Sequence, residues 1–229
     1  PHVDWAVGLT ALTCLLPWGH RPGSPRLDRL VAFGLFSVLS LVYGGYAIYH
    51  CQMTMLHGDE GHYLLVTQSL FHDGDVDLAD DLERATTDEF HTIPFGPHVA
   101  PSSPTGKVIS IHPVGLSALL VPAYGAGLAL WNNPRLACAL FMALLAAACV
   151  AIGYLWLRRL AFTRWSAFVC AGAAASTPPL ALFSNQLYPD LSGVLIGFVV
   201  LWAALPWPSG DDRPPPANSP VSLGLLAGL

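Results

Sequence analysis

Residues 30–50 read LVAFGLFSVLSLVYGGYAIYH, an apolar run without Asp, Glu, Lys or Arg, and the acidic pair Asp59-Glu60 follows shortly after it. A helix needs about 20 residues to cross a bilayer, so this run predicts a membrane-spanning helix. Tyr46 and Tyr49, near its end, are typical of the aromatic belt at a membrane surface. We therefore expect two adjacent carboxylates at the point where a span meets water.

The composition of the whole chain agrees with a membrane protein. Of the 229 residues, 53% are hydrophobic and only 11% are charged, and the mean hydropathy is positive. Further apolar stretches occupy residues 113–131, 136–157, 167–183 and 191–207. These features predict an all-α fold, a polytopic transmembrane helical bundle integral to the cell's inner or plasma membrane.

Two short basic segments set the expected orientation of this bundle. Residues 21–29 and 158–164 both carry arginines, so both are expected in the cytoplasm. Three apolar stretches lie between them, and an odd number of crossings would place them on opposite sides. The stretch 113–131 is the weakest span because it contains prolines and glycines. We expect it to lie in the outer interface, or to dip into the membrane and return.

This topology divides the chain into three parts. Residues 1–50 hold the N-terminal spans and a basic cytoplasmic loop, and it stays open whether the apolar run 3–18 is a span or a processed signal. Residues 51–131 form a large extracytoplasmic first loop with juxtamembrane helices. Residues 132–229 hold further transmembrane helices. The final apolar run, 221–229, is too short to cross a bilayer, so we expect the chain to be truncated within a helix of a longer protein.

Nearly all titratable side chains gather in the predicted outer loop. Ten of the fifteen acids lie in residues 59–89, and seven of the nine histidines lie in residues 50–112. The formal net charge is −5, which argues against nucleic acid as a partner and against docking on anionic head groups. We therefore look for chemistry in this loop.

Asp59 has two possible roles that the sequence leaves open. A carboxylate before a helix can accept hydrogen bonds from the free amides of the first turn. Alternatively, a carboxylate held at a membrane surface can act as a general base toward a hydroxyl group. Asp190 begins a predicted span and shares the predicted outer face with Asp59, and the same two roles apply to it.

The order of several short motifs resembles a known superfamily. Asp59-Glu60 follows a span, the segment from Lys107 to Pro113 ends the outer loop, Arg158-Arg159 ends another span, and Pro189-Asp190 ends the next outer turn. This ordered set is similar to the N-terminal half of GT-C membrane glycosyltransferases, which include protein O-mannosyltransferases and aminoarabinose transferases. The resemblance covers residues 30–229.

The resemblance implies a sugar transfer from a polyprenyl-phosphate donor on the extracytoplasmic face, usually with inversion. By this resemblance Asp59 corresponds to the family's catalytic pair of acidic residues, with Glu60 as its neighbour, and Asp190 corresponds to the second acidic residue on the outer face. His112 stands before Pro113 where relatives often have Lys, so the donor phosphate would meet His112 or Lys107. The sugar carrier and membrane lipid are the implied partners, and the acceptor stays undetermined.

The chemistry of the leaving group points to the same residues. A departing phosphate is stabilised by a cation, for which Lys107, Arg84 and a charged histidine are the candidates. A carboxylate that takes the proton of an attacking hydroxyl accelerates such a transfer by roughly 10²–10⁴.

We assign no metal ligand from the sequence, although a divalent metal cofactor stays open. Asp73, Asp75 and Asp77 resemble the start of a calcium loop, but Leu78 occupies the position that needs Gly, so we interpret the segment as an acidic turn. Six histidines could assemble a metal site with Asp59 or Glu60, without any HExxH spacing to support it. They are His57, His62, His72, His91, His98 and His112.

Two other functions compete with the glycosyltransferase. A transporter or flippase of lipid-linked sugar is compatible with the broken stretches 113–131 and 177–179, although mid-membrane charges and repeats are not evident. A non-catalytic scaffold with an outer sensing domain would tolerate the loss of all three candidate acids.

Overall fold

The computed structural model describes residues 24–83, 90, 96, 98–100 and 106–204. These residues are mostly helical, and their only β-type pairing is an isolated bridge between Val99 and Ser110. The all-α fold class is confirmed for this part of the chain. The apolar run 3–18, Arg21 and the proline-rich segment 209–220 lie outside the described residues.

Three described helices are long and apolar enough to cross a membrane. They are α2 (Pro25–Met53), α5 (Val114–Trp131) and α6 (Pro134–Arg159). The helix α9 (Asp190–Ala204) is apolar but shorter. Large apolar side chains project outward from these helices, for example Leu41 at 78% exposure. Such an apolar exterior suits a lipid environment, so the fold supports a membrane protein.

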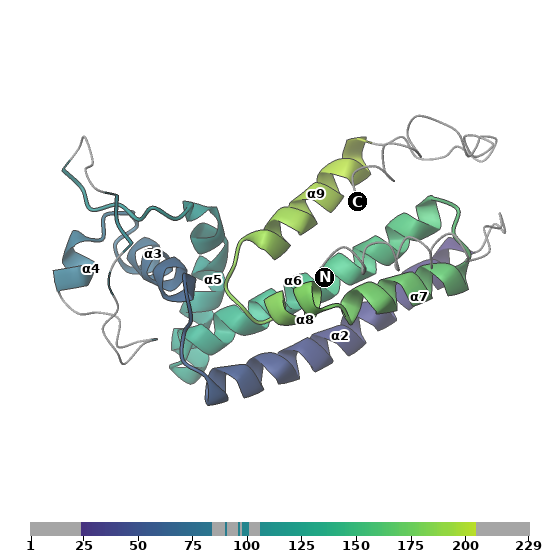
Figure 1. Ribbon diagram of the computed structural model, residues 1–229, viewed down its shortest axis with the longest axis horizontal. Coiled ribbons are helices and arrows are strands. Elements are labelled where there is room, and N and C mark those ends of the chain that lie inside the picture. Colours follow the sequence, from purple (N-terminus) through teal and green to yellow (C-terminus); the bar gives the residue numbers. More distant parts are fainter. Residues whose placement is uncertain (1–23, 84–89, 91–95, 97, 101–105, 205–229) are drawn as a thin grey trace, which may run out of the picture.

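Helix α6 lies at the centre of the bundle and contacts α2, α7 (Arg164–Ala175) and α9 (Figure 1). Its buried face is rich in alanine, which lets neighbouring helices approach closely. On α2, the small residues Gly44 and Ala47 are buried. Small residues on both helices therefore line the contact between α2 and α6. The buried alanines of α6 are Ala137, Ala139, Ala143, Ala146, Ala147 and Ala151.

The predicted break before Pro178-Pro179 is confirmed. Helix α7 ends at Ala175, and the short helix α8 (Pro178–Phe183) begins after two residues. Proline cannot donate the amide hydrogen bond that would continue α7. The hydroxyl of Tyr43 on α2 donates to the Ala175 carbonyl oxygen at 2.8 Å. This buried bond satisfies one of the acceptors that the break leaves open.

An ion-pair cluster joins three helices at one end of the bundle. Oδ1 of Asp28, near the start of α2, lies 3.1 Å from Nε of Arg158 and 2.7 Å from Nε of Arg164. Arg164 also donates to the Ser24 carbonyl at 3.0 Å. The described parts of the two basic segments therefore lie at the same end of the bundle, as the charge distribution predicts.

The helix α5 takes a different direction from α2, α6 and α7. In Figure 1 these three run along the length of the bundle, whereas α5 lies across the end where α2 finishes. It joins α6 through a tight turn in which Asn132 has φ 49° and the Asn133 amide donates to the Gly127 carbonyl. The interpretation of residues 113–131 as a non-crossing helix stays a prediction, and the direction of α5 is compatible with it.

The helix α3 (Glu60–His72) is more enclosed than a surface helix. Every residue from Glu60 to Ser69 is buried, whereas Phe71 is 40% exposed. The Ser117 hydroxyl of α5 donates to the Tyr63 carbonyl at 2.9 Å. Packing against α5 and the chain around it encloses every face of this part of the helix.

The α5–α6 turn leads to a testable prediction. A Cβ atom added at Gly127 would lie 2.7 Å from Cβ of Ala137, 2.7 Å from Cα of Pro134 and 2.9 Å from the Asn133 carbonyl oxygen. We expect Gly127→Ala to destabilise the protein by about 1–3 kcal/mol, because backbone atoms must move to make room. Gly115→Ala is the control, since nothing lies within 4 Å of its added Cβ. Thermal denaturation in lipid nanodiscs tests this, and equal midpoints for the two variants would contradict it.

Candidate functional site

Asp59 occupies the residue before α3, but its carboxylate does not cap the helix. Its backbone carbonyl accepts the amides of His62 at 3.0 Å and Tyr63 at 3.1 Å. Among the described residues, no first-turn amide donates to its side chain. The capping interpretation is therefore wrong for this carboxylate, which is 41% exposed and points toward two histidines instead.

His98 and His112 lie beside Asp59 and beside each other. Oδ1 of Asp59 is 3.6 Å from Nδ1 of His98 and 3.7 Å from Nε2 of His112. The same two nitrogens are 3.2 Å apart. His112 is mostly buried, with 12% of its side chain exposed, whereas 49% of the His98 side chain is exposed. One carboxylate oxygen and two ring nitrogens thus lie within 3.7 Å of one another.

Backbone pairing brings these two histidines together. The Ile111 amide donates to the His98 carbonyl at 3.0 Å, and the Ala100 amide donates to the Ile109 carbonyl at 2.8 Å. This pairing surrounds the isolated Val99–Ser110 bridge and places the segment before α5 against the segment 98–100. The site therefore draws on chain segments that lie far apart in sequence.

His62, in the first turns of α3, is the third imidazole of the cluster. Its ring stacks on that of His98, with centroids 4.0 Å apart and planes inclined by 16°. It lies at 5.3 Å and 17° from the His112 ring. Burial lowers the pKa of His62 to about 4, and the neighbouring His98 and His112 add to this effect. His62 is therefore neutral near pH 7.

Glu60 has a different environment from its neighbour Asp59. It is 3% exposed, and each carboxylate oxygen accepts a backbone amide. Oε2 accepts from His57 at 3.1 Å, and Oε1 accepts from Leu187 at 3.0 Å. Glu60 thus ties the start of α3 to the turn before α9. Its predicted catalytic role is untested, and these bonds give it a positioning role.

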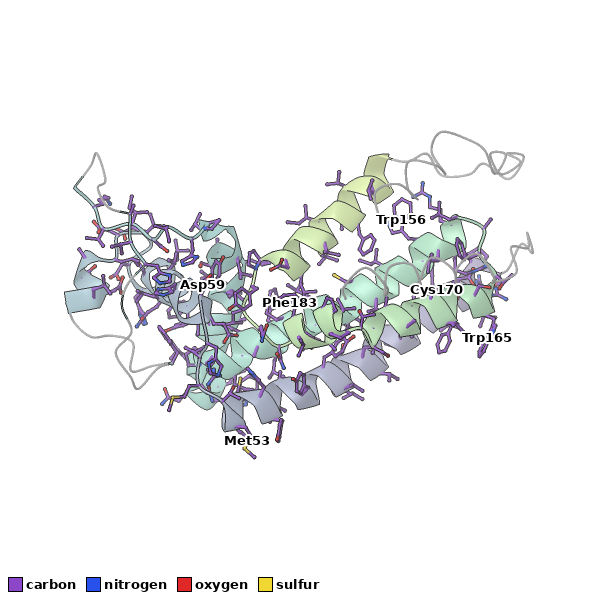
Figure 2. All side chains as sticks on the ribbon, viewed as in Figure 1. Met53, Asp59, Trp156, Trp165, Cys170 and Phe183 are labelled. Atoms are coloured by element: carbon purple, nitrogen blue, oxygen red, sulfur yellow. The ribbon has the colours of Figure 1, made fainter. Side chains whose placement is uncertain are left out.

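Asp190 lies at the same end of the bundle as Asp59. Asp190 begins α9, shortly after Leu187, whose amide donates to Oε1 of Glu60 at 3.0 Å. The start of α9 therefore lies close to the start of α3, which Asp59 precedes. In Figure 2 Asp59 lies at the end of the bundle opposite Trp165, near the start of α9. The shared location expected for Asp59 and Asp190 is present.

Tyr188 covers the turn that precedes Asp59. Its hydroxyl is 3.5 Å from the His57 carbonyl oxygen. Gly58 in this turn has φ +56°, and a Cβ there would lie 2.6 Å from the Tyr188 hydroxyl. Glycine adopts this conformation without strain and leaves room for the phenol. Neither Tyr188 nor Gly58 was singled out from the sequence, because no local sequence pattern signals a contact between residues so far apart.

The residues that were predicted to bind the donor phosphate have different surroundings in the structure. His112 lies beside Asp59, as described above. Lys107 is paired with acids: Nζ lies 3.7 Å from Oδ2 of Asp75 and 4.0 Å from Oδ2 of Asp77. Arg84 lies outside the described residues.

The acidic turn organises the chain through hydrogen bonds of its own. The Asp77 amide donates to Oδ1 of Asp75 at 2.9 Å, and the Val108 amide donates to Oδ1 of Asp77 at 3.0 Å. These bonds agree with the acidic-turn interpretation.

Arg135 is a cation at this end of the bundle that the sequence analysis did not single out. Its Nη1 atom donates to the Thr54 carbonyl oxygen at 2.7 Å. This bond anchors the chain that leaves α2 to the start of α6.

No protein-family model, curated protein or solved structure matches this chain.

Proposed function

We propose that this chain belongs to a membrane glycosyltransferase that uses a polyprenyl-phosphate sugar as donor, with Asp59 as the general base on the extracytoplasmic face. The observation that carries the proposal is the exposed Asp59 carboxylate at one end of an apolar helical bundle, beside two histidines. A lipid-linked donor keeps its tail in the bilayer and its head group at the surface. Its reaction centre must therefore lie at such an end.

The proposed orientation follows from the basic cluster. Arg158 and Arg164 gather around Asp28. Trp165, the neighbour of Arg164 in the chain, lies at the end of the bundle opposite Asp59 (Figure 2). Basic segments between spans favour the cytoplasm. The Asp59 end would then face the extracytoplasmic side, together with the large first loop.

The proposed reaction is a displacement at the anomeric carbon of the sugar. An acceptor hydroxyl attacks this carbon, and Asp59 takes the hydroxyl proton as the new bond forms. The bond from the anomeric carbon to the phosphate oxygen breaks, and the polyprenyl phosphate leaves with the electron pair. Lys107 or an N–H group of His112 would donate a hydrogen bond to the leaving phosphate, because hydrogen bonds to ionised phosphate oxygens are strong. Asp190, at the start of α9 and close to the start of α3, would help to orient the acceptor.

A transfer assay with the full-length protein tests the proposal. The protein is reconstituted in liposomes and supplied with radiolabelled polyprenyl-phosphate sugars and a membrane extract as the acceptor source. We expect label to move from lipid to a new product. Uptake or flipping of the labelled sugar into sealed vesicles, without any product, would overturn the enzyme in favour of a transporter or flippase.

A further inference from the structure

We propose that Asp59, His98 and His112 form a binding site for a transition-metal ion of the Zn²⁺ class. Oδ1 of Asp59, Nδ1 of His98 and Nε2 of His112 form a triangle with sides of 3.2, 3.6 and 3.7 Å. Tetrahedral zinc with bonds of about 2.0–2.2 Å separates its ligand atoms by roughly 3.3–3.6 Å. The three atoms are thus already spaced like one face of a zinc site.

The relative orientation of the two imidazole rings suits shared coordination. The centroids of His98 and His112 are 5.4 Å apart, and their planes are inclined by 28°. With a metal about 2.0–2.1 Å from each nitrogen, tetrahedral geometry puts the ring centroids roughly 5 Å apart. The rings therefore need little movement to direct both nitrogens at one ion.

The types of donor atom select the class of metal. Two imidazole nitrogens and one carboxylate oxygen suit zinc and its neighbours, whereas magnesium and calcium prefer ligand sets made of oxygen. His62 adds a further nitrogen, because one ligand atom from each of His62, His98 and His112 lies within 4.8 Å of the others. The His62 ring stacks on His98, so its nitrogen would join the ion only after the ring turns.

The local electrostatics favour a cation at this point. Asp59 supplies a negative charge at the edge of the histidine pair. Lys107 is paired with Asp75 and Asp77. The Asp59 carboxylate would therefore attract a divalent ion.

The fold holds the proposed ligands on three segments. Asp59 precedes α3, His112 precedes α5, and His98 is paired to the segment before α5 by the bonds around the Val99–Ser110 bridge. Ligands supported by secondary structure keep their geometry better than ligands on free loops. The site goes beyond the proposed function, since it leaves Oδ2 of Asp59 available for the proton of an acceptor.

Metal binding to the full-length protein tests the inference without any sugar substrate. The purified protein is stripped with a chelator, equilibrated with Zn²⁺, desalted and analysed by mass spectrometry for bound metal. We expect His98→Ala and His112→Ala to weaken Zn²⁺ binding by at least about 10- to 100-fold, since even the loss of outer-shell partners has this effect. His98 is half exposed, so its replacement spares the core. His72→Ala, on the same helix as His62 and outside the cluster, is the control and should bind like wild type.

A second readout identifies the donor atoms. Titration with Co²⁺ should give the visible absorption bands of a low-symmetry nitrogen and oxygen site in wild type, and His98→Ala should lose them. The inference is overturned if wild type retains no Zn²⁺, or if His98→Ala and His112→Ala bind it as well as His72→Ala does. Sugar transfer in the presence of excess chelator would leave the proposed function standing without the metal. Metal binding without sugar transfer would support the metal site and contradict the proposed function.

Discussion

Asp59→Asn is expected to lower the rate of sugar transfer by about 10²–10⁴-fold, the usual contribution of a positioned general base. Asparagine has nearly the same shape as aspartate but cannot take the proton of the acceptor hydroxyl. The fold should survive, because the Asp59 carboxylate makes no capping bond to the described first turn of α3. The measurement is the initial rate of label transfer by the full-length protein in liposomes, at saturating donor.

The control for this experiment is Asp73→Asn, which removes a carboxylate at the opposite end of α3. Asp73 is exposed and follows the last turn of the helix, so its loss should leave transfer unchanged. Full activity of Asp59→Asn would show that Asp59 is not the general base. Asp190 would then be the next candidate for that role. Unfolding of Asp59→Asn would be visible as a lowered midpoint of thermal denaturation, which separates a structural effect from a catalytic one.

Glu60→Gln is expected to destabilise the protein by about 2–4 kcal/mol, because both oxygens of the buried Glu60 carboxylate accept backbone amides. Glutamine retains one acceptor oxygen and places an NH₂ group against the other amide, so two donors face each other. The affected amides belong to His57 and Leu187. Thermal denaturation of the protein in lipid nanodiscs measures the loss.

Asp73→Asn is again the matched control, since it removes a carboxylate from the exposed end of the same helix. Its midpoint should stay close to that of wild type. A Glu60→Gln variant as stable as Asp73→Asn, yet without transfer activity, would contradict the positioning role and favour the catalytic one. A destabilised variant that retains its activity per folded molecule would support the positioning role.

The helices of the bundle could be predicted from the sequence because their signal is local. Residues 30–50 and 136–157 are continuous apolar runs, and α2 and α6 enclose them. The end of α7 could also be predicted, because Pro178 and Pro179 prevent a continuous helix. The enclosure of α3 could not, because the chain that packs around it comes from distant segments.

The different environments of Asp59 and Glu60 could not be read from the sequence. The two residues are adjacent at the start of a helix, where successive side chains point in directions about 100° apart. Which direction is buried depends on the turn that holds Leu187, and this turn lies far away in sequence. One carboxylate therefore becomes a buried acceptor of amides while its neighbour stays exposed beside the histidines.

The sequence by itself determined that this protein is helical, apolar and equipped with titratable groups between its long helices, because hydrophobicity over about 20 residues is a local property. It also indicated that Asp59 and Asp190 share one end of the bundle, since the positions of the arginines constrain the connections. Only the tertiary structure decided which histidines meet Asp59. His62 comes from α3, whereas His98 and His112 are brought together by backbone bonds across the Val99–Ser110 bridge. The two segments joined by this bridge are short and show no periodic sequence pattern. The sequence therefore does not indicate which histidines of the loop come together, and only the packing of these segments decides it.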